Sequence, residues 1–111
     1  MRLSTHILDT AIGRPVAGVE ILLEKHRGSK WRALARGTTD SDGRCKTLLG
    51  ENEMEATTYR LRFFTRPYFA AQGLATLYPL IDITFEVHDA GAHYHVPLLL
   101  TANGYTTYRG S

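Results

Sequence analysis

The chain has 111 residues, of which 43% are hydrophobic and 22% are charged. This length fits one domain covering residues 1–111, because domain sizes peak at about 100–150 residues, and the apolar content excludes a disordered chain. A single cysteine excludes an internal disulfide and a multi-cysteine metal site. The net charge of +2 is too small an imbalance to indicate a nucleic-acid partner.

The two ends of the sequence and its apolar runs bear on targeting. No apolar run approaches the length of about 18 residues that a membrane-spanning helix needs. The segment from Met1 to Gly13 lacks a signal peptide's apolar core of about 7–15 residues, and the last three residues differ from the peroxisomal address Ser-Lys-Leu. One unpaired thiol suits a reducing compartment, so we expect a cytoplasmic protein with no membrane partner.

Alternating apolar and polar residues predict strands along most of the chain. The expected strands cover residues 4–9, 19–24, 31–39, 44–49, 59–63, 81–88, 93–100 and 105–108. The clearest is 81–88, where apolar residues at odd positions alternate with polar residues at even positions. Turn-forming residues at 40–43 and 102–104 separate neighbouring strands.

One short helix is expected at residues 66–73. Pro67 suits the first turn of a helix, and Gly73 can end it. Seven or eight short strands with regularly spaced turns are typical of an antiparallel sandwich or barrel. The sequence therefore predicts an all-β domain with a single short helix.

Histidines are the first candidates for chemistry, because their usual pKa lies between pH 5 and 8. His26 stands between two basic residues and is expected to be solvated, and His88 shares the polar face of its strand. His93 and His95 are two residues apart, so both side chains point to one face of a strand. Such a pair can supply two metal ligands or form a hydrogen-bonded polar pair, and spacing alone leaves both interpretations open.

Three further residues have competing interpretations. By spacing alone, His6 in the first strand and Arg44 after a turn fit structural or surface roles. Cys45 suggests a Cys–His hydrolase, because neighbouring basic residues depress a thiol pKa. Strand alternation points Cys45 away from those neighbours, so we expect it to be a packing residue.

The C-terminal segment is the most unusual part of the sequence. A strand is expected almost up to the last residue, although chain ends usually fray unless they are docked. Arg109 carries a fixed charge, Gly110 permits a sharp bend, and Ser111 brings a hydroxyl and a carboxylate. These residues indicate a site near the end of the chain, with its chemistry unspecified.

Four motifs resemble those of one known family. They are Leu3 to Asp9 with Gly13-Arg14-Pro15, Asp42-Gly43-Arg44, Tyr94 to Leu100, and the terminal Tyr108-Arg109-Gly110-Ser111. In this order they resemble the signatures of the 5-hydroxyisourate hydrolases, the transthyretin-like enzymes of urate breakdown. The resemblance extends from the first strand to the last residue, which makes it specific.

The resemblance implies a transthyretin-like sandwich of two antiparallel sheets with a short helix. It also implies a homotetramer, a dimer of dimers, with active sites in the channel between dimers. His6, Arg44, His95 and the terminal tetrapeptide would line one site, whereas His93 is not part of the family motif. No metal ion and no organic cofactor is implied.

The implied reaction adds water across the N1–C6 amide of 5-hydroxyisourate, opening the six-membered ring. The product would be 2-oxo-4-hydroxy-4-carboxy-5-ureidoimidazoline. His6 and His95 would activate water and transfer protons, with the general base unassigned between them. Arg44 would polarise a substrate carbonyl. The resemblance gives Ser111 a catalytic role, and Tyr108, Arg109 and Ser111 would position the ring together with His6, Arg44 and His95.

Other classes of function remain open at this point. A transthyretin-like carrier would hold an aromatic, hormone-like ligand in the same channel. A zinc-dependent hydrolase would use His93, His95 and another histidine, and would lose activity without its metal. A purely structural protein is the third alternative, and the four motifs argue against it.

Overall fold

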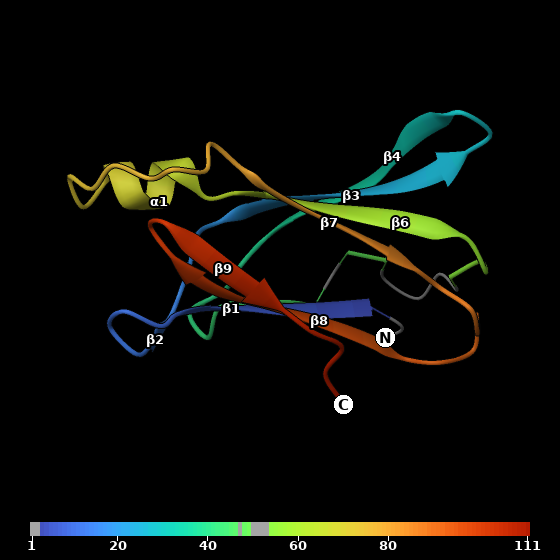
Figure 1. The fold of residues 1–111 in the computed structure, drawn as a ribbon. Helices are drawn as coiled ribbons and strands as arrows, with labels where there is room; N and C mark the ends of the chain where they lie inside the picture. The colour runs from blue at the N-terminus through green and yellow to red at the C-terminus, as the bar shows by residue number, and fades with distance from the viewer. Residues whose placement is uncertain (1–2, 47, 50–53) are drawn as a thin grey trace.

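The computed structural model describes residues 3–46, 48–49 and 54–111. Two β-sheets face each other, with one short helix at the end of the sandwich, as Figure 1 shows. This confirms the prediction of an all-β sandwich. Within the described residues, no helix is long and apolar enough to cross a membrane.

The strands divide between the two sheets as follows. The first sheet has the order β2-β1-β8-β9, with β5 also pairing with β1, and the second has the order β4-β3-β6-β7. The first contains β1 (Leu3–Asp9), β2 (Arg14–Pro15), β5 (Arg44–Cys45), β8 (Tyr94–Thr101) and β9 (Gly104–Thr107). The second contains β3 (Glu20–Arg27), β4 (Lys30–Thr38), β6 (Thr58–Phe64) and β7 (Ile81–Glu86), and the helix is α1 (Arg66–Ala70).

The structure departs from the expected pattern at several places, and one is β2, which lies outside the expected strands. β1 and β8 run parallel, whereas the other strand pairs are antiparallel. The strand expected at 44–49 is confined to β5, and residue 47 lies outside the described residues. The helix ends at Ala70, and a turn follows in which the N–H of Leu74 donates to the Phe69 carbonyl at 2.9 Å.

The core forms where the inward faces of the two sheets meet. Side chains alternate between the core and the outer face in β1, β6 and β7. In β6 and β7 this alternation largely matches the apolar and polar residues of the sequence, whereas β1 buries the polar Thr5 and Asp9 and turns Leu8 outward. The largest fully buried side chains are Tyr59, Phe63, Phe69, Leu3, Ile7, Ile21, Leu23, Leu48, Leu61, Ile81, Leu98 and Leu100. Cys45 is 1% exposed and unpaired, which confirms its packing role.

A tight turn before β5 sets the position of Arg44. The Asp40 carboxylate accepts hydrogen bonds from the backbone N–H groups of Asp42 and Arg44 at 2.9 and 3.0 Å. The bond from Arg44 is the main cause that lowers the pKa of Asp40. Gly43 adopts a φ of 75°, and its carbonyl accepts the N–H of Ile7 at 2.8 Å. The turn therefore fastens β5 to β1.

We expect Gly43→Ala to lower the free energy of unfolding by roughly 3 kcal/mol or more, because positive φ and overpacking both cost energy. A Cβ at Gly43 would lie 2.5 Å from the carbonyl oxygen of Ile7. The matched control is Gly28→Ala, where φ is 60° and no atom lies within 4 Å. It should cost about 1–2 kcal/mol. Equal losses in urea unfolding would contradict the close approach at Gly43.

Candidate active site

Polar side chains gather on the outer face of the first sheet. On β1, Ser4 and His6 are half-buried and alternate with fully buried neighbours. Ser4 lies opposite His95 of β8, and His6 lies opposite Arg44 of β5. Directly paired residues share a face of a sheet, so three of the predicted site residues, His6, Arg44 and His95, come together across three strands.

His95 and His93 share one hydroxyl group. The Ser4 Oγ lies 2.8 Å from His95 Nδ1 and 3.1 Å from His93 Nε2. His93 is exposed and His95 is half-buried. The expectation that both imidazoles point to one face is confirmed, and in this structure the two rings are joined through Ser4.

The C-terminal segment is docked against His95. The N–H of Gly110 donates to the His95 carbonyl at 2.8 Å, and the two residues form an isolated antiparallel bridge. Any side chain at position 110 would overlap the His95 ring, since a Cβ there would meet its Cδ2 atom. The exposed Ser111 follows directly, so the bridge brings the end of the chain beside His95.

The His95 imidazole is held in its neutral form near pH 7. Burial is the main cause that lowers its pKa, and the positive charges of Arg44, His6 and His93 lower it further. A hydrogen bond with the Ser4 backbone acts in the opposite direction. A neutral imidazole with one free nitrogen can accept a proton from water, which is the chemistry of a general base.

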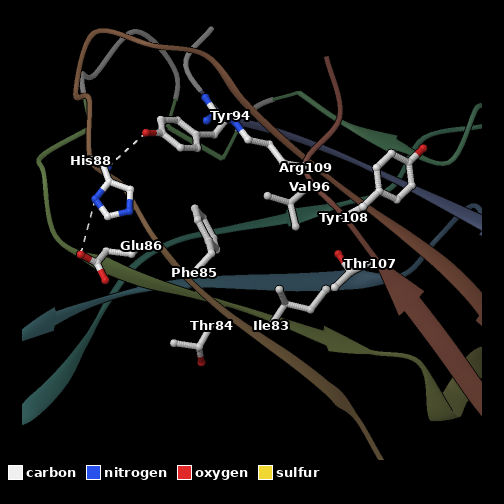
Figure 2. A pocket seen from close by; sticks show the side chains of 10 residues that line it. All are labelled: Ile83, Thr84, Phe85, Glu86, His88, Tyr94, Val96, Thr107, Tyr108 and Arg109. Atoms are coloured by element: carbon white, nitrogen blue, oxygen red, sulfur yellow. Dashed lines mark hydrogen bonds and ion pairs between the residues drawn. The ribbon is translucent and has the colours of Figure 1, made fainter.

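Tyr108 and Arg109 line a separate hollow at the edge of the sandwich. Figure 2 shows this hollow, whose volume is about 330 Å³, between β7 and the ends of β8 and β9. The Arg109 guanidinium lies 4.2 Å above the centre of the Tyr94 ring and donates to the His93 carbonyl at 3.4 Å. The terminal tetrapeptide therefore divides, with Gly110 at His95 and the two preceding residues among those that line this hollow.

The two remaining histidines differ in their surroundings. His26 is half-buried, with its ring centroid 4.9 Å from that of Trp31, so the expectation of a solvated ring is wrong. The aromatic partner lies across the hairpin of β3 and β4, where a local pattern of charges does not reveal it. His88 is exposed on the polar edge, as predicted, with Nδ1 3.6 Å from a Glu86 carboxylate oxygen.

Metal-ligating side chains do not cluster in the described part of the chain. No three His, Cys, Asp or Glu side chains there lie close enough to hold a metal ion together. The His-x-His pair instead has a serine between its rings.

Ser4 is the site residue that the sequence interpretation missed. It belongs to the first motif, and it shares the face of His6 because the two are two residues apart on β1. That spacing was the available signal. Neither segment by itself reveals the pairing of β1 with β8, which places Ser4 beside His95.

Comparison with known proteins places the chain in a family. The model of the HIUase/Transthyretin family matches residues 3–110, and the chain belongs to this family. It is 46% identical over 109 residues to the 5-hydroxyisourate hydrolase of Salmonella typhimurium, covering 98% of this chain and 80% of that protein. It is 39% identical over 111 residues to the mouse (Mus musculus) 5-hydroxyisourate hydrolase, covering 98% and 94%.

Solved structures show the same fold. The 5-hydroxyisourate hydrolase of Klebsiella pneumoniae superposes with a TM-score of 0.85 at 34% identity, covering 98% of both chains. Transthyretin from Sparus aurata superposes with a TM-score of 0.91 at 31% identity, covering 98% of this chain and 96% of that one. The transthyretin-like fold and the family resemblance are therefore confirmed.

Gly110→Ala is expected to displace the His95 ring or release the chain end, because the added methyl group overlaps the ring. The ring resonances of His95 should shift strongly in an NMR spectrum. Gly104→Ala is the matched control, since its Cβ would meet Thr101 Oγ1 at 3.6 Å, an ordinary contact distance. An unchanged His95 signal in Gly110→Ala would show that the bridge does not form in solution.

Arg44→Gln is expected to raise the pKa of His95 toward the usual value of about 6.5, because a like charge is removed. NMR titration of the ring measures this directly, with Arg36→Gln on β4 as the control. Because the folded-state pKa is lowered, the unfolded chain binds more protons below about pH 6.5. The contribution of His95 to the free energy of unfolding therefore falls as the pH drops through that window. Arg44→Gln should make this fall smaller.

Proposed function

We propose that this chain is a 5-hydroxyisourate hydrolase that opens the six-membered ring at its N1–C6 amide and yields 2-oxo-4-hydroxy-4-carboxy-5-ureidoimidazoline. Relatives bearing that name match it over nearly its whole length at 46% and 39% identity. The observation that carries the proposal is the outer face of the first sheet. There a neutral imidazole at His95 lies with His6 and Arg44.

These groups suit the hydrolysis of a cyclic amide. Water needs a base to become a nucleophile, and the lowered pKa leaves the His95 imidazole unprotonated and able to act at neutral pH. The attacked carbonyl carbon then carries an oxyanion. Arg44 offers a permanently charged fork of N–H donors to that oxygen. His6, on the strand between them, is the second imidazole of the site that can take part in proton transfer.

The terminal tetrapeptide completes the proposed site. Ser111 acts beside His95, since the Gly110 bridge brings the chain end to that residue. Tyr108 and Arg109 are assigned to substrate binding together with His6, Arg44, His95 and Ser111. Both residues line the hollow at the β7 edge. They would therefore reach the same substrate through their backbone groups or across a subunit interface of the assembly.

The proposal includes the assembly and the setting of the enzyme. Residues 1–111 form a single domain that assembles as a homotetramer, a dimer of dimers, with its sites between subunits. The edge strands β4, β7 and β9 support this, since exposed sheet edges are normally paired or protected. The reaction uses no cofactor, and the free Cys45 suits the cytoplasm.

A carrier of an aromatic ligand is the second candidate. Transthyretin of sea bream, solved in complex with thyroxine, superposes with a TM-score of 0.93 at 30% identity. A fold shared this closely does not separate a carrier from an enzyme, because function depends on the site. The imidazoles and guanidinium on the outer face of the first sheet favour the enzyme.

The assay is the loss of ultraviolet absorbance of freshly generated 5-hydroxyisourate at neutral pH. We expect the purified protein to accelerate this loss over the spontaneous rate. His6→Ala and His95→Ala should each lower kcat/KM by about 10²–10⁴-fold, the usual range for positioned acid–base groups. Arg44→Ala should lower it by about 10²–10³-fold, the usual range for loss of an oxyanion donor.

His26→Ala is the control variant, since that ring lies on the second sheet against Trp31. Circular dichroism should show that all four variants are folded. No acceleration by the wild type, together with tight binding of an iodinated aromatic, would support the carrier instead. Full activity in two of the three site variants would overturn the site assignment.

A further inference from the structure

The proposed reaction creates a charge problem at His95. When the imidazole accepts a proton from water, it becomes a cation. His95 is half-buried, and Arg44 and His6 lie on the same face of the sheet. Both burial and like charges disfavour a cation there. A route that moves the charge away from His95 during the reaction would lower this cost.

Ser4 and His93 provide such a route. The Ser4 hydroxyl lies within hydrogen-bond distance of a ring nitrogen on each histidine, at 2.8 Å from His95 Nδ1 and 3.1 Å from His93 Nε2. A hydroxyl has one proton and accepts others, so it can donate to one ring while it accepts from the other. His93 is exposed, so water solvates a positive charge there.

One arrangement of protons before the reaction makes these three groups a relay. If His95 carries its proton on Nδ1, it donates to Ser4, and Ser4 donates to Nε2 of His93. The other nitrogen of His95, Nε2, is then free to accept a proton. The three groups lie in a row, and the hydrogen bond between His95 and Ser4 is held by seven consecutive residue pairs between β1 and β8.

We propose that Ser4 and His93 form a proton relay that stores the water-derived proton away from His95, an inference that rests on the proposed hydrolase function. As Nε2 of His95 gains a proton, its Nδ1–H bond breaks and that proton passes to Ser4. The original hydroxyl proton of Ser4 simultaneously passes to Nε2 of His93, which becomes the cation. When His95 then protonates the departing N1, each transfer reverses, and all three residues return to their starting state.

Positive groups lie on both sides of the relay, so it is the exposure of His93 to water that favours a cation there over one at the half-buried His95. Arg44 and His6 are on the His95 side, on β5 and β1. On the His93 side, Arg109 donates to the backbone carbonyl of His93, and its guanidinium stacks on the Tyr94 ring. Ser4 and His93 do not touch the substrate in this scheme. They are positioning and relay residues for His95.

The variants that test the relay are Ser4→Ala, Ser4→Thr and His93→Gln. Ser4→Ala removes the connecting hydroxyl, and glutamine at position 93 can hydrogen-bond to Ser4 but cannot carry the proton. Each should lower kcat by about tenfold or more with KM nearly unchanged, part of the about 10²–10⁴-fold that general acid–base catalysis supplies. Ser4→Thr should retain most of the rate. The double variant should be no slower than Ser4→Ala, because both changes interrupt one path.

The controls are Ser29→Ala in the β3–β4 turn and His26→Gln beside Trp31, both on the other sheet. Added imidazole should restore part of the rate of His93→Gln and leave the wild type unaffected, a response that a purely structural role would not give. A wild-type kcat in His93→Gln, or no response to imidazole, would overturn the relay.

A measurement without substrate separates this proposal from the function itself. Nitrogen-15 NMR of the wild type should show the His95 proton on Nδ1, and Ser4→Ala should shift the ring toward the other tautomer. Failure of the wild type to hydrolyse 5-hydroxyisourate would overturn the proposed function. An unchanged His95 tautomer in Ser4→Ala would overturn the relay even in an active enzyme.

Discussion

The parallel pairing of β1 with β8 is the constraint on which the site depends. Seven consecutive residue pairs join segments separated by about ninety residues in the chain, and they place Ser4 opposite His95. A shift of one residue would turn His95 or Ser4 to the other face, because side chains alternate. The buried Leu3, Ile7 and Leu98 oppose such a shift, since it would expose them to water.

Two further attachments to this strand pair build the rest of the face. The turn at Gly43 fastens β5 to β1 and sets Arg44 beside His6. The bridge of Gly110 with His95 brings the last residue to the same place. Each attachment contributes a charge or a hydrogen bond to His95 and lies at a position where a glycine permits close approach. The chemistry of one imidazole is thus adjusted by three distant parts of the chain.

Features that depend on residues close together in the chain could be predicted from the sequence, whereas features that depend on distant residues could not. β7 was predicted closely because its apolar and polar residues alternate without exception. The burial of Cys45 followed from the same alternation. His26 was misjudged because Trp31, its partner, lies across a hairpin. His6, Arg44 and His95 came from resemblance to a family, and spacing alone favoured a surface or structural role for His6 and Arg44.

The amino-acid sequence by itself determined most of the strands and turns, and in β6 and β7 the side that faces the core. These depend on neighbours within a few residues, through the two-residue period of a strand and the backbone freedom of glycine. The tertiary structure decided which strands are paired, that β1 and β8 are parallel, and that Ser4 joins two imidazoles. It also decided the lowered pKa of His95, because burial and the charges around a ring exist only once distant segments have packed together.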